Sequence, residues 1–173
     1  AGVLDKCREV EKRLAAAGVR VKLDDSDNSP GWKFNEWEMK GVPVRLELGP
    51  RDIENGKMVC VRRDTHEKAE YALENAESVV TALLENVQKD MLESARARRD
   101  KRIVYADDVA GILAGVEGGN FVKAGWCGKR CCEDKIKEQT AATARVYAEG
   151  ETAEKCAVCG EKAEHMVIFA RAY

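Results

Sequence analysis

The sequence predicts an α/β fold, with the chain divided into two units. Strand-like and helical patterns alternate over the first half, one long helical pattern occupies the middle, and the last third holds paired cysteines. Strands that alternate with helices indicate a layered α/β architecture. The 173-residue chain has 45% hydrophobic and 35% charged residues, so it can fill a core. This composition excludes a disordered protein.

The first half predicts helices and strands in alternation. Apolar residues from Leu4 to Leu14 recur at helical spacing, and Gly18 ends that helix. Pro30 opens a second helix, because its fixed φ suits a first turn. The expected elements after the first helix are a strand over 19–23, a helix over 32–40, a strand over 42–48, a loop with a tight Asn-Gly turn over 49–56, and a strand over 57–65 that pairs back.

The second half opens with a long helical pattern that has one broad apolar face. The expected elements here are this long helix over 73–99, a strand over 102–105, a helix over 107–116 and a strand over 165–170. A boundary between units is expected in or just after the long helix. We therefore predict one unit over 1–95 and a second over 96–173.

Charge and hydropathy exclude several classes of function. The net charge of −2 gives no global reason to expect a nucleic acid, so any RNA contact must come from a local patch. No run of about 20 apolar residues exists, so we expect no membrane span. The start has no export signal, and seven cysteines without one favour free thiols in a reducing compartment, so we expect a cytoplasmic protein. The abrupt start without Met suggests a fragment of a longer protein.

The cysteines fall into isolated and paired positions. Cys7 and Cys60 stand alone, and each is expected to be a small buried hydrophobe. The paired positions are Cys127 with Cys131 or Cys132, and Cys156 with Cys159. Spacing alone leaves Cys131 and Cys132 equivalent, although geometry is expected to allow only one of them to reach a shared ion.

The run KCAVCG has the form of a zinc knuckle, because a two-residue gap lets both thiolates face one ion. Four thiolates make a closed tetrahedral site, which predicts a structural role for zinc and not a catalytic one. The alternative is a redox dithiol, which requires a strand-to-helix context that this segment lacks. His165 lies in a strand-like run and is expected to pack instead of binding metal.

The run DDSDNSPGWKFNEWEMKGVPVRLELGPRDIENG resembles the anticodon-binding domain of prolyl-tRNA synthetases, in their archaeal and eukaryotic-like form. The resemblance continues through WCGKRCCEDKIKEQTAATARV and KCAVCG to the terminal FARAY, and so covers nearly the whole chain. It implies a mixed-sheet anticodon-binding domain of the class II synthetase type, with its first strand missing here. A small α+β zinc-binding domain would follow.

The resemblance also implies an enzyme of which this chain is a part. Prolyl-tRNA synthetases are class II ligases that activate proline with ATP and esterify it to its tRNA. Their catalytic domain, which uses ATP and Mg²⁺, would precede this region, and the full enzyme would be a homodimer. The implied partners are the anticodon of tRNA(Pro) and the chain's own catalytic domain. A stand-alone tRNA-binding module is the alternative, and a zinc-stabilised interaction domain is a third possibility.

By resemblance, Glu38, Arg45 and Arg51 match the positions that recognise guanine in the family. The proline anticodon has two adjacent guanines, whose N1 and N2 donors suit a carboxylate and whose O6 and N7 acceptors suit Arg. Without the family, each of the three would be an ordinary solvated charge. Trp32, Phe34 and Trp37 could offer stacking faces for bases, although aromatic residues at helical spacing more often fill a core.

Two further expectations come from the resemblance. The family pattern selects Cys132 over Cys131, so the implied zinc ligands are Cys127, Cys132, Cys156 and Cys159. The C-terminal carboxylate of Tyr173 would approach the catalytic site of the full enzyme and act by positioning. The plain alternative for Tyr173 is a strand that simply ends the sheet.

Overall fold

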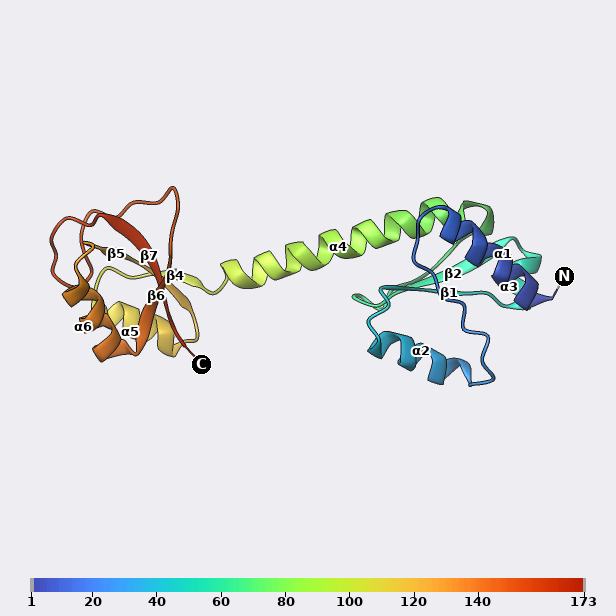
Figure 1. The fold of residues 1–173 in the computed structure, drawn as a ribbon, viewed down its shortest axis with the longest axis horizontal. Coiled ribbons are helices and arrows are strands. Elements are labelled where there is room, and N and C mark those ends of the chain that lie inside the picture. Colours follow the sequence, from blue (N-terminus) through green and yellow to red (C-terminus); the bar gives the residue numbers. More distant parts are fainter. Residues whose placement is uncertain (1, 173) are drawn as a thin grey trace. The chain divides into compact units, whose positions relative to one another are not determined.

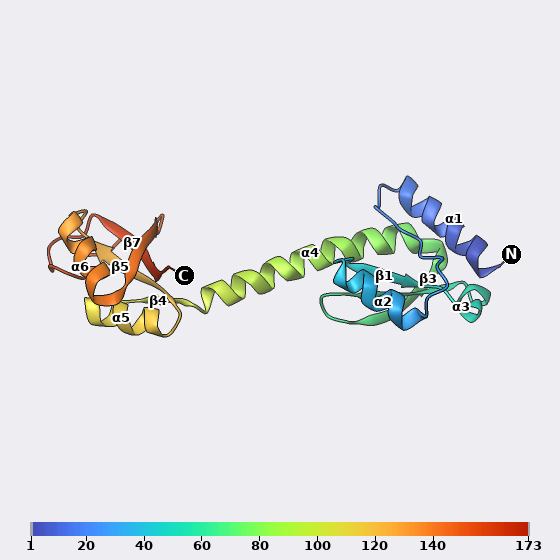
Figure 2. The same cartoon turned by 60° about the horizontal axis from the view of Figure 1, so that its bottom comes forward.

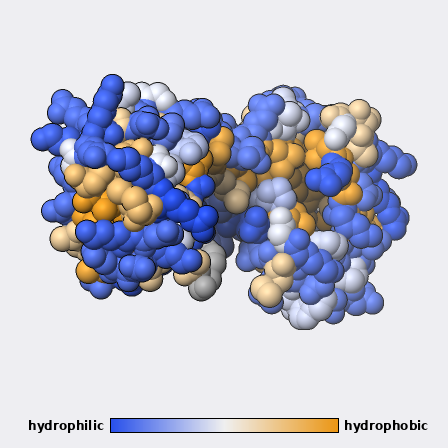
Figure 3. Space-filling view, turned by 60° about the vertical axis from the view of Figure 1, so that its left-hand side comes forward, coloured by the Kyte–Doolittle hydropathy of each residue, from blue (hydrophilic) through white to orange (hydrophobic). Residues whose placement is uncertain are grey.

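A computed structural model describes residues 2–172 of the chain. The chain divides into two compact units, Ala1–Ser94 and Ala95–Tyr173 (Figure 1). Hydrophilic residues cover most of the visible surface of each unit, and smaller hydrophobic areas lie among these residues (Figure 3). No helix among the described residues is long and apolar enough to span a membrane.

The first unit is built on a three-stranded antiparallel sheet of order β1-β2-β3. Its elements are α1 (Val3–Ala16), α2 (Pro30–Met39), β1 (Val44–Glu47), α3 (Pro50–Glu54), β2 (Lys57–Arg62), β3 (Lys68–Ala72), the short 3₁₀ turn η1 (Leu73–Asn75) and α4 (Ala76–Asp100), which continues into the second unit. Helix α2, the central strand pair and the long helix α4 confirm the sequence prediction.

The two faces of this sheet differ because successive strand residues point to opposite sides. Met58 and Cys60 of β2 lie in a buried core with Val10 of α1 and Val80 of α4. The opposite face carries Arg45 and, on the same strand, Glu47. Helix α2 lies against that second face, whereas α1 and α4 cover the first, as Figures 1 and 2 show. This second face, which we call the polar face of the first sheet, thus lies opposite the buried core.

Three sequence predictions for this unit were wrong or incomplete. Residues 19–23 form no strand, because none of the described strands pairs with them, although Val19 and Val21 still pack against the core. The loop over 49–56 contains helix α3, since Pro50 suits a first helical position and Asp52 accepts a hydrogen bond from the Gly49 N–H at 2.8 Å. Strand β3 was not predicted, because its alternation of Ala, Glu and Tyr is weakly apolar.

The second unit is built on a four-stranded mixed sheet of order β4-β5-β7-β6. Its elements after α4 are β4 (Ile103–Tyr105), α5 (Val109–Glu117), β5 (Phe121–Trp126), α6 (Arg130–Thr140), β6 (Ala142–Tyr147) and β7 (His165–Arg171). Strands β4 and β5 are parallel and joined through α5, while the other pairs are antiparallel. The predicted strands near residues 103 and 165 and the helix near residue 109 are confirmed.

Helices α5 and α6 cover one face of this sheet. Ile112 of α5 and Ile136 of α6 are fully buried against Val122 and Phe169 of the sheet. Strands β6 and β7 are neighbours in the sheet, but the chain between them runs through residues 148–164. That long connection carries the KCAVCG run. The mixed α/β fold class is confirmed, but the expected mixed sheet is not in the first unit, whose described strands are all antiparallel; the parallel strand pair lies in this second unit.

Replacing Asp108 with alanine is expected to destabilise the second unit by about 1 kcal/mol, because the N-cap of α5 is lost. The Asp108 carboxylate accepts a hydrogen bond from the Gly111 N–H at 2.7 Å, which satisfies a donor that has no partner inside the helix. Urea unfolding followed by circular dichroism measures the change. Asp107→Ala, at the adjacent exposed position, is the control, and an equal loss in both variants would contradict the capping role.

Candidate metal centre and nucleic-acid interface

Four cysteine sulfurs converge in the second unit, from three separate segments. The Sγ atoms of Cys127, Cys132, Cys156 and Cys159 all lie within 4.8 Å of one another. Cys127 Sγ lies 3.6 Å from Cys132 Sγ and 3.7 Å from Cys159 Sγ. Ligands 2.3 Å from a tetrahedral zinc are about 3.8 Å apart, so these separations suit one ion held by four thiolates.

Local backbone structure brings each pair of cysteines to the cluster. Cys127 follows the end of β5, and Gly128, with φ of +78°, turns the chain into α6, whose first turns carry Cys132. In the second pair, the Gly160 N–H donates to the Cys156 carbonyl at 3.0 Å, and Gly160 has φ of +72°. These tight turns return two thiols to one point, as the zinc-knuckle pattern predicted.

The structure distinguishes Cys132 from its neighbour. Cys132 is buried with the cluster, whereas Cys131 is exposed. Consecutive residues on a helix point in directions about 100° apart, so only one of the two can face the other thiols. His165 contacts the rings of Trp126 and Tyr147 instead, with centroids 6.1 Å and 4.7 Å away.

Burial and hydrogen bonding act in opposite directions on these thiols. Burial raises the pKa of Cys132 and of Cys127. Burial also acts to raise the pKa of Cys156, but the backbone N–H groups of Cys159 and Val158 outweigh it and lower that pKa to about 7. Four thiolates packed together repel one another, so a cation is needed to keep all of them deprotonated. The donor set therefore fits a soft divalent ion such as zinc.

A second group of functional candidates lies on the polar face of the first sheet. Arg45 Nη1 donates to Glu38 Oε1 at 2.7 Å, which joins two of the residues that the family pattern singled out. The Arg45 guanidinium also lies over the Phe34 ring, 3.9 Å from its centroid. The structure thus brings together a carboxylate, a guanidinium and an aromatic ring, the groups that recognise an unpaired base.

Sequence reasoning missed Glu47, which lies beside this group. Arg45 Nε donates to Glu47 Oε1 at 3.0 Å, and Lys68 Nζ donates to Glu47 Oε2 at 2.8 Å. Burial acts to raise the pKa of Glu47, but the hydrogen bonds from Lys68 and Arg45 outweigh it and hold the pKa below its ordinary value. The sequence could have predicted that Glu47 lies beside Arg45, because the two residues are two positions apart in a predicted strand and such residues point to the same face.

The remaining candidates are placed separately. Arg51 is exposed on α3, and no hydrogen bond or ion pair joins it to the Glu38–Arg45 pair among the described residues. Trp32 is half exposed, and Trp37 Nε1 donates to Asp24 Oδ2 at 2.7 Å, so neither fills a core. Tyr173 lies outside the described residues.

Comparisons with known proteins match each of the two units to a family model. A model of the anticodon binding domain matches residues 1–83, and a model of the prolyl-tRNA synthetase C-terminal region matches residues 111–173. A proline–tRNA ligase of Lachnospira eligens is 48% identical over 100% of this chain and 37% of its own length. A proline–tRNA ligase of Acetoanaerobium sticklandii is 50% identical over 99% of this chain and 37% of its own length. The chain belongs to the prolyl-tRNA synthetase family.

A solved prolyl-tRNA synthetase shows the same fold. The enzyme of Cryptosporidium parvum, in complex with L-proline and AMP, matches 98% of this chain with a TM-score of 0.92 and 37% identity. This chain covers 37% of that structure and a similar share of the curated relatives, so it spans little more than a third of a prolyl-tRNA synthetase. The family resemblance inferred from the sequence motifs is confirmed. Glu38 and Arg45 fall in the part matched by the anticodon-binding model, and the four clustered cysteines fall in the part matched by the C-terminal model.

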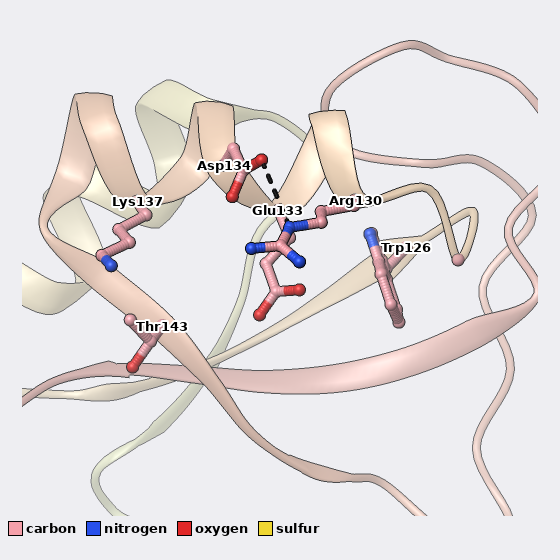
Figure 4. Close-up of a pocket in the computed structure, with 7 residues that line it drawn as sticks. Trp126, Arg130, Glu133, Asp134, Lys137 and Thr143 are labelled. Atoms are coloured by element: carbon pink, nitrogen blue, oxygen red, sulfur yellow. Dashed lines mark ion pairs between the residues drawn. The ribbon is translucent and has the colours of Figure 1, made fainter.

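An open groove lies beside the cysteine cluster in the second unit. It is lined by Trp126, Gly128, Arg130, Glu133, Asp134, Lys137 and Thr143 (Figure 4). Arg130 pairs with Asp134 at 3.8 Å, so charges of both signs offset one another along α6. No paired nucleophile and base are found among these lining residues.

Proposed function

We propose that this chain is the part of a proline–tRNA ligase that recognises the anticodon of tRNA(Pro) and carries a structural zinc ion. The Glu38–Arg45 pair, which joins α2 to the polar sheet face, is the observation that carries the first half of this proposal. The match of residues 1–83 to an anticodon binding domain supports it. The matches to full-length ligases favour this function over a stand-alone tRNA-binding module.

Guanine recognition follows from the chemistry of the two side chains. The Glu38 carboxylate can accept hydrogen bonds from guanine N1 and N2, while the Arg45 fork can donate to O6 and N7. Both side chains are partly exposed, at 36% and 21%, so a base can reach them. The exposed Arg51 on α3 would supply a third contact to the anticodon, as the family pattern implies.

Zinc would be held by Cys127, Cys132, Cys156 and Cys159, which fit it in number and spacing. Bound zinc supplies a closed four-thiolate crosslink and no open position for water or substrate. The crosslink joins the end of β5, the start of α6 and the long connection between β6 and β7. It would therefore fix the strand that leads to Tyr173.

The chemical steps of the ligase belong to the catalytic domain of the full enzyme, which would bind ATP and Mg²⁺. Tyr173 would act by positioning, with its carboxylate near that active site. We place the full enzyme in the cytoplasm as a homodimer, and the thiol-rich site supports a reducing compartment. A complete enzyme that carries this region is expected to attach proline to tRNA(Pro).

Replacing Arg45 with alanine is expected to weaken binding of a proline anticodon stem-loop by about 1–3 kcal/mol for each guanine that it no longer recognises. The physical reason is the removal of the fork that satisfies the guanine acceptors. Titration of the RNA at fixed salt measures the effect, because phosphate contacts depend strongly on salt. Glu38→Ala is expected to behave in the same way.

Arg8→Ala is the matched control for Arg45. Arg8 is an exposed arginine of α1, and its ion pair with Asp25 spans 3.7 Å. Its replacement removes the same charge from the same unit without touching the Glu38–Arg45 pair. Equal weakening by Arg8→Ala and Arg45→Ala would show general electrostatic attraction and would reject guanine recognition by Arg45.

A further inference from the structure

The Arg45 guanidinium is held from three sides. The Phe34 ring lies against its face, Glu38 accepts from Nη1, and Glu47 accepts from Nε. Arginine has five N–H donors in a rigid planar fork, and these two carboxylates engage one donor each. Because the contact from Glu47 is at Nε, it fixes the plane of the fork, and no hydrogen bond to a described residue occupies Nη2.

The Glu47 carboxylate is itself held by two hydrogen bonds. Its side chain is 18% exposed and comes from β1, the same strand as Arg45. Its second oxygen accepts from Lys68 of β3, which reaches across β2 to the same face. Glu38, Glu47, Arg45 and Lys68 therefore form a group of two negative and two positive charges. Such a group has little net attraction for phosphate, so any affinity that it adds must come from directed hydrogen bonds.

We infer that Glu47 is a positioning residue for anticodon recognition. Its carboxylate orients the Arg45 fork toward guanine, and its negative charge reduces the non-specific attraction of this face to RNA. This inference rests on the proposed function. A planar fork recognises O6 and N7 of guanine only when its plane is aligned with the base, so an unclamped Arg45 keeps its charge but loses selectivity. Loss of Glu47 also leaves one uncompensated positive charge on the face, which strengthens binding to any phosphate backbone.

The test compares Glu47→Gln with Glu70→Gln in the full 173-residue chain. Glu70 lies in the same cross-strand row, because Val59 pairs with both Glu47 and Glu70. It forms its own ion pair with Lys57, at 2.8 Å. Each variant loses one negative charge from the same sheet face, but only Glu47→Gln alters the surroundings of Arg45. The probes are a proline anticodon stem-loop RNA and the same RNA with one anticodon guanine replaced by adenine.

Glu47→Gln is expected to lower the ratio of affinities for the two RNAs by about tenfold, which corresponds to most of the discrimination at one base. Its affinity for the adenine-containing RNA is expected to stay the same or rise. Glu70→Gln is expected to keep the wild-type ratio. An unchanged ratio of affinities in Glu47→Gln overturns the inference, and this includes the case in which the affinities for both RNAs fall equally. A wild-type chain that binds both RNAs equally overturns the proposed function itself, and the inference with it.

Discussion

Cys132→Ser is expected to abolish zinc binding and unfold the second unit, whereas Cys131→Ser is expected to leave both intact. Cys132 is 4% exposed and within 3.6 Å of Cys127 Sγ, while Cys131 is exposed. Structural zinc contributes about 10–16 kcal/mol in zinc-finger peptides, and a unit of this size draws only about 3–5 kcal/mol from its core. Loss of one thiolate therefore removes more free energy than the folded unit has in reserve.

Elemental analysis of the purified variants measures the zinc content, and thermal unfolding followed by circular dichroism measures stability. The wild-type chain is expected to carry one zinc per chain, and chelation is expected to unfold the second unit before the first. The adjacent cysteine is a stringent control, because both variants make the same chemical change one residue apart. Equal zinc content in Cys131→Ser and Cys132→Ser would contradict the proposed ligand set.

Gly125→Ala is expected to destabilise the second unit by about 3 kcal/mol, the upper end of the usual cost of overpacking. A Cβ at this position would lie 2.2 Å from the Lys155 carbonyl oxygen and 2.8 Å from Ala153 Cβ. The backbone at Gly125 also accepts a hydrogen bond from the Ala157 N–H at 2.9 Å. The KCAVCG turn thus packs directly on β5, and a methyl group would displace it.

Urea unfolding of the second unit and its zinc affinity are the two measurements for this variant. We expect both to fall, because the displaced turn carries Cys156 and Cys159. Gly118→Ala is the control, since a Cβ there would meet Asn120 Nδ2 at 2.8 Å, at the end of a flexible side chain that can turn away. A Gly125→Ala protein as stable as Gly118→Ala would show that the close approach of turn and strand has no energetic consequence.

Patterns with strong periodicity or fixed spacing were predictable from the sequence. Helix α4 has a long apolar stripe, and α2 has proline at its start and Gly41, with φ of +84°, just after its end. The two cysteine pairs predicted a common site, because the gap within each pair is set by local turns. In each case the signal is contained in a short segment, so no distant contact is needed to interpret it.

Features that depend on a partner segment were not predictable in the same way. Residues 19–23 alternate like a strand, but a strand exists only where another strand offers its backbone groups. Strand β3 was missed for the opposite reason, because it pairs with β2 despite a weak pattern of its own. Helix α3 depends on the cap that Asp52 provides to Gly49.

The sequence by itself determined the family, the longer helices and the presence of four thiols able to share one ion, because these follow from motifs and local spacing. Spacing alone left Cys131 and Cys132 equivalent, and the family pattern selected Cys132. The tertiary structure gives the physical reason, because the packing of α6 on the sheet buries Cys132 in the cluster and leaves Cys131 exposed. Only the tertiary structure decided that Arg45 lies between Glu38 and Glu47. Side-chain contacts of this kind join a helix to a strand, and the packing of the two elements sets their geometry.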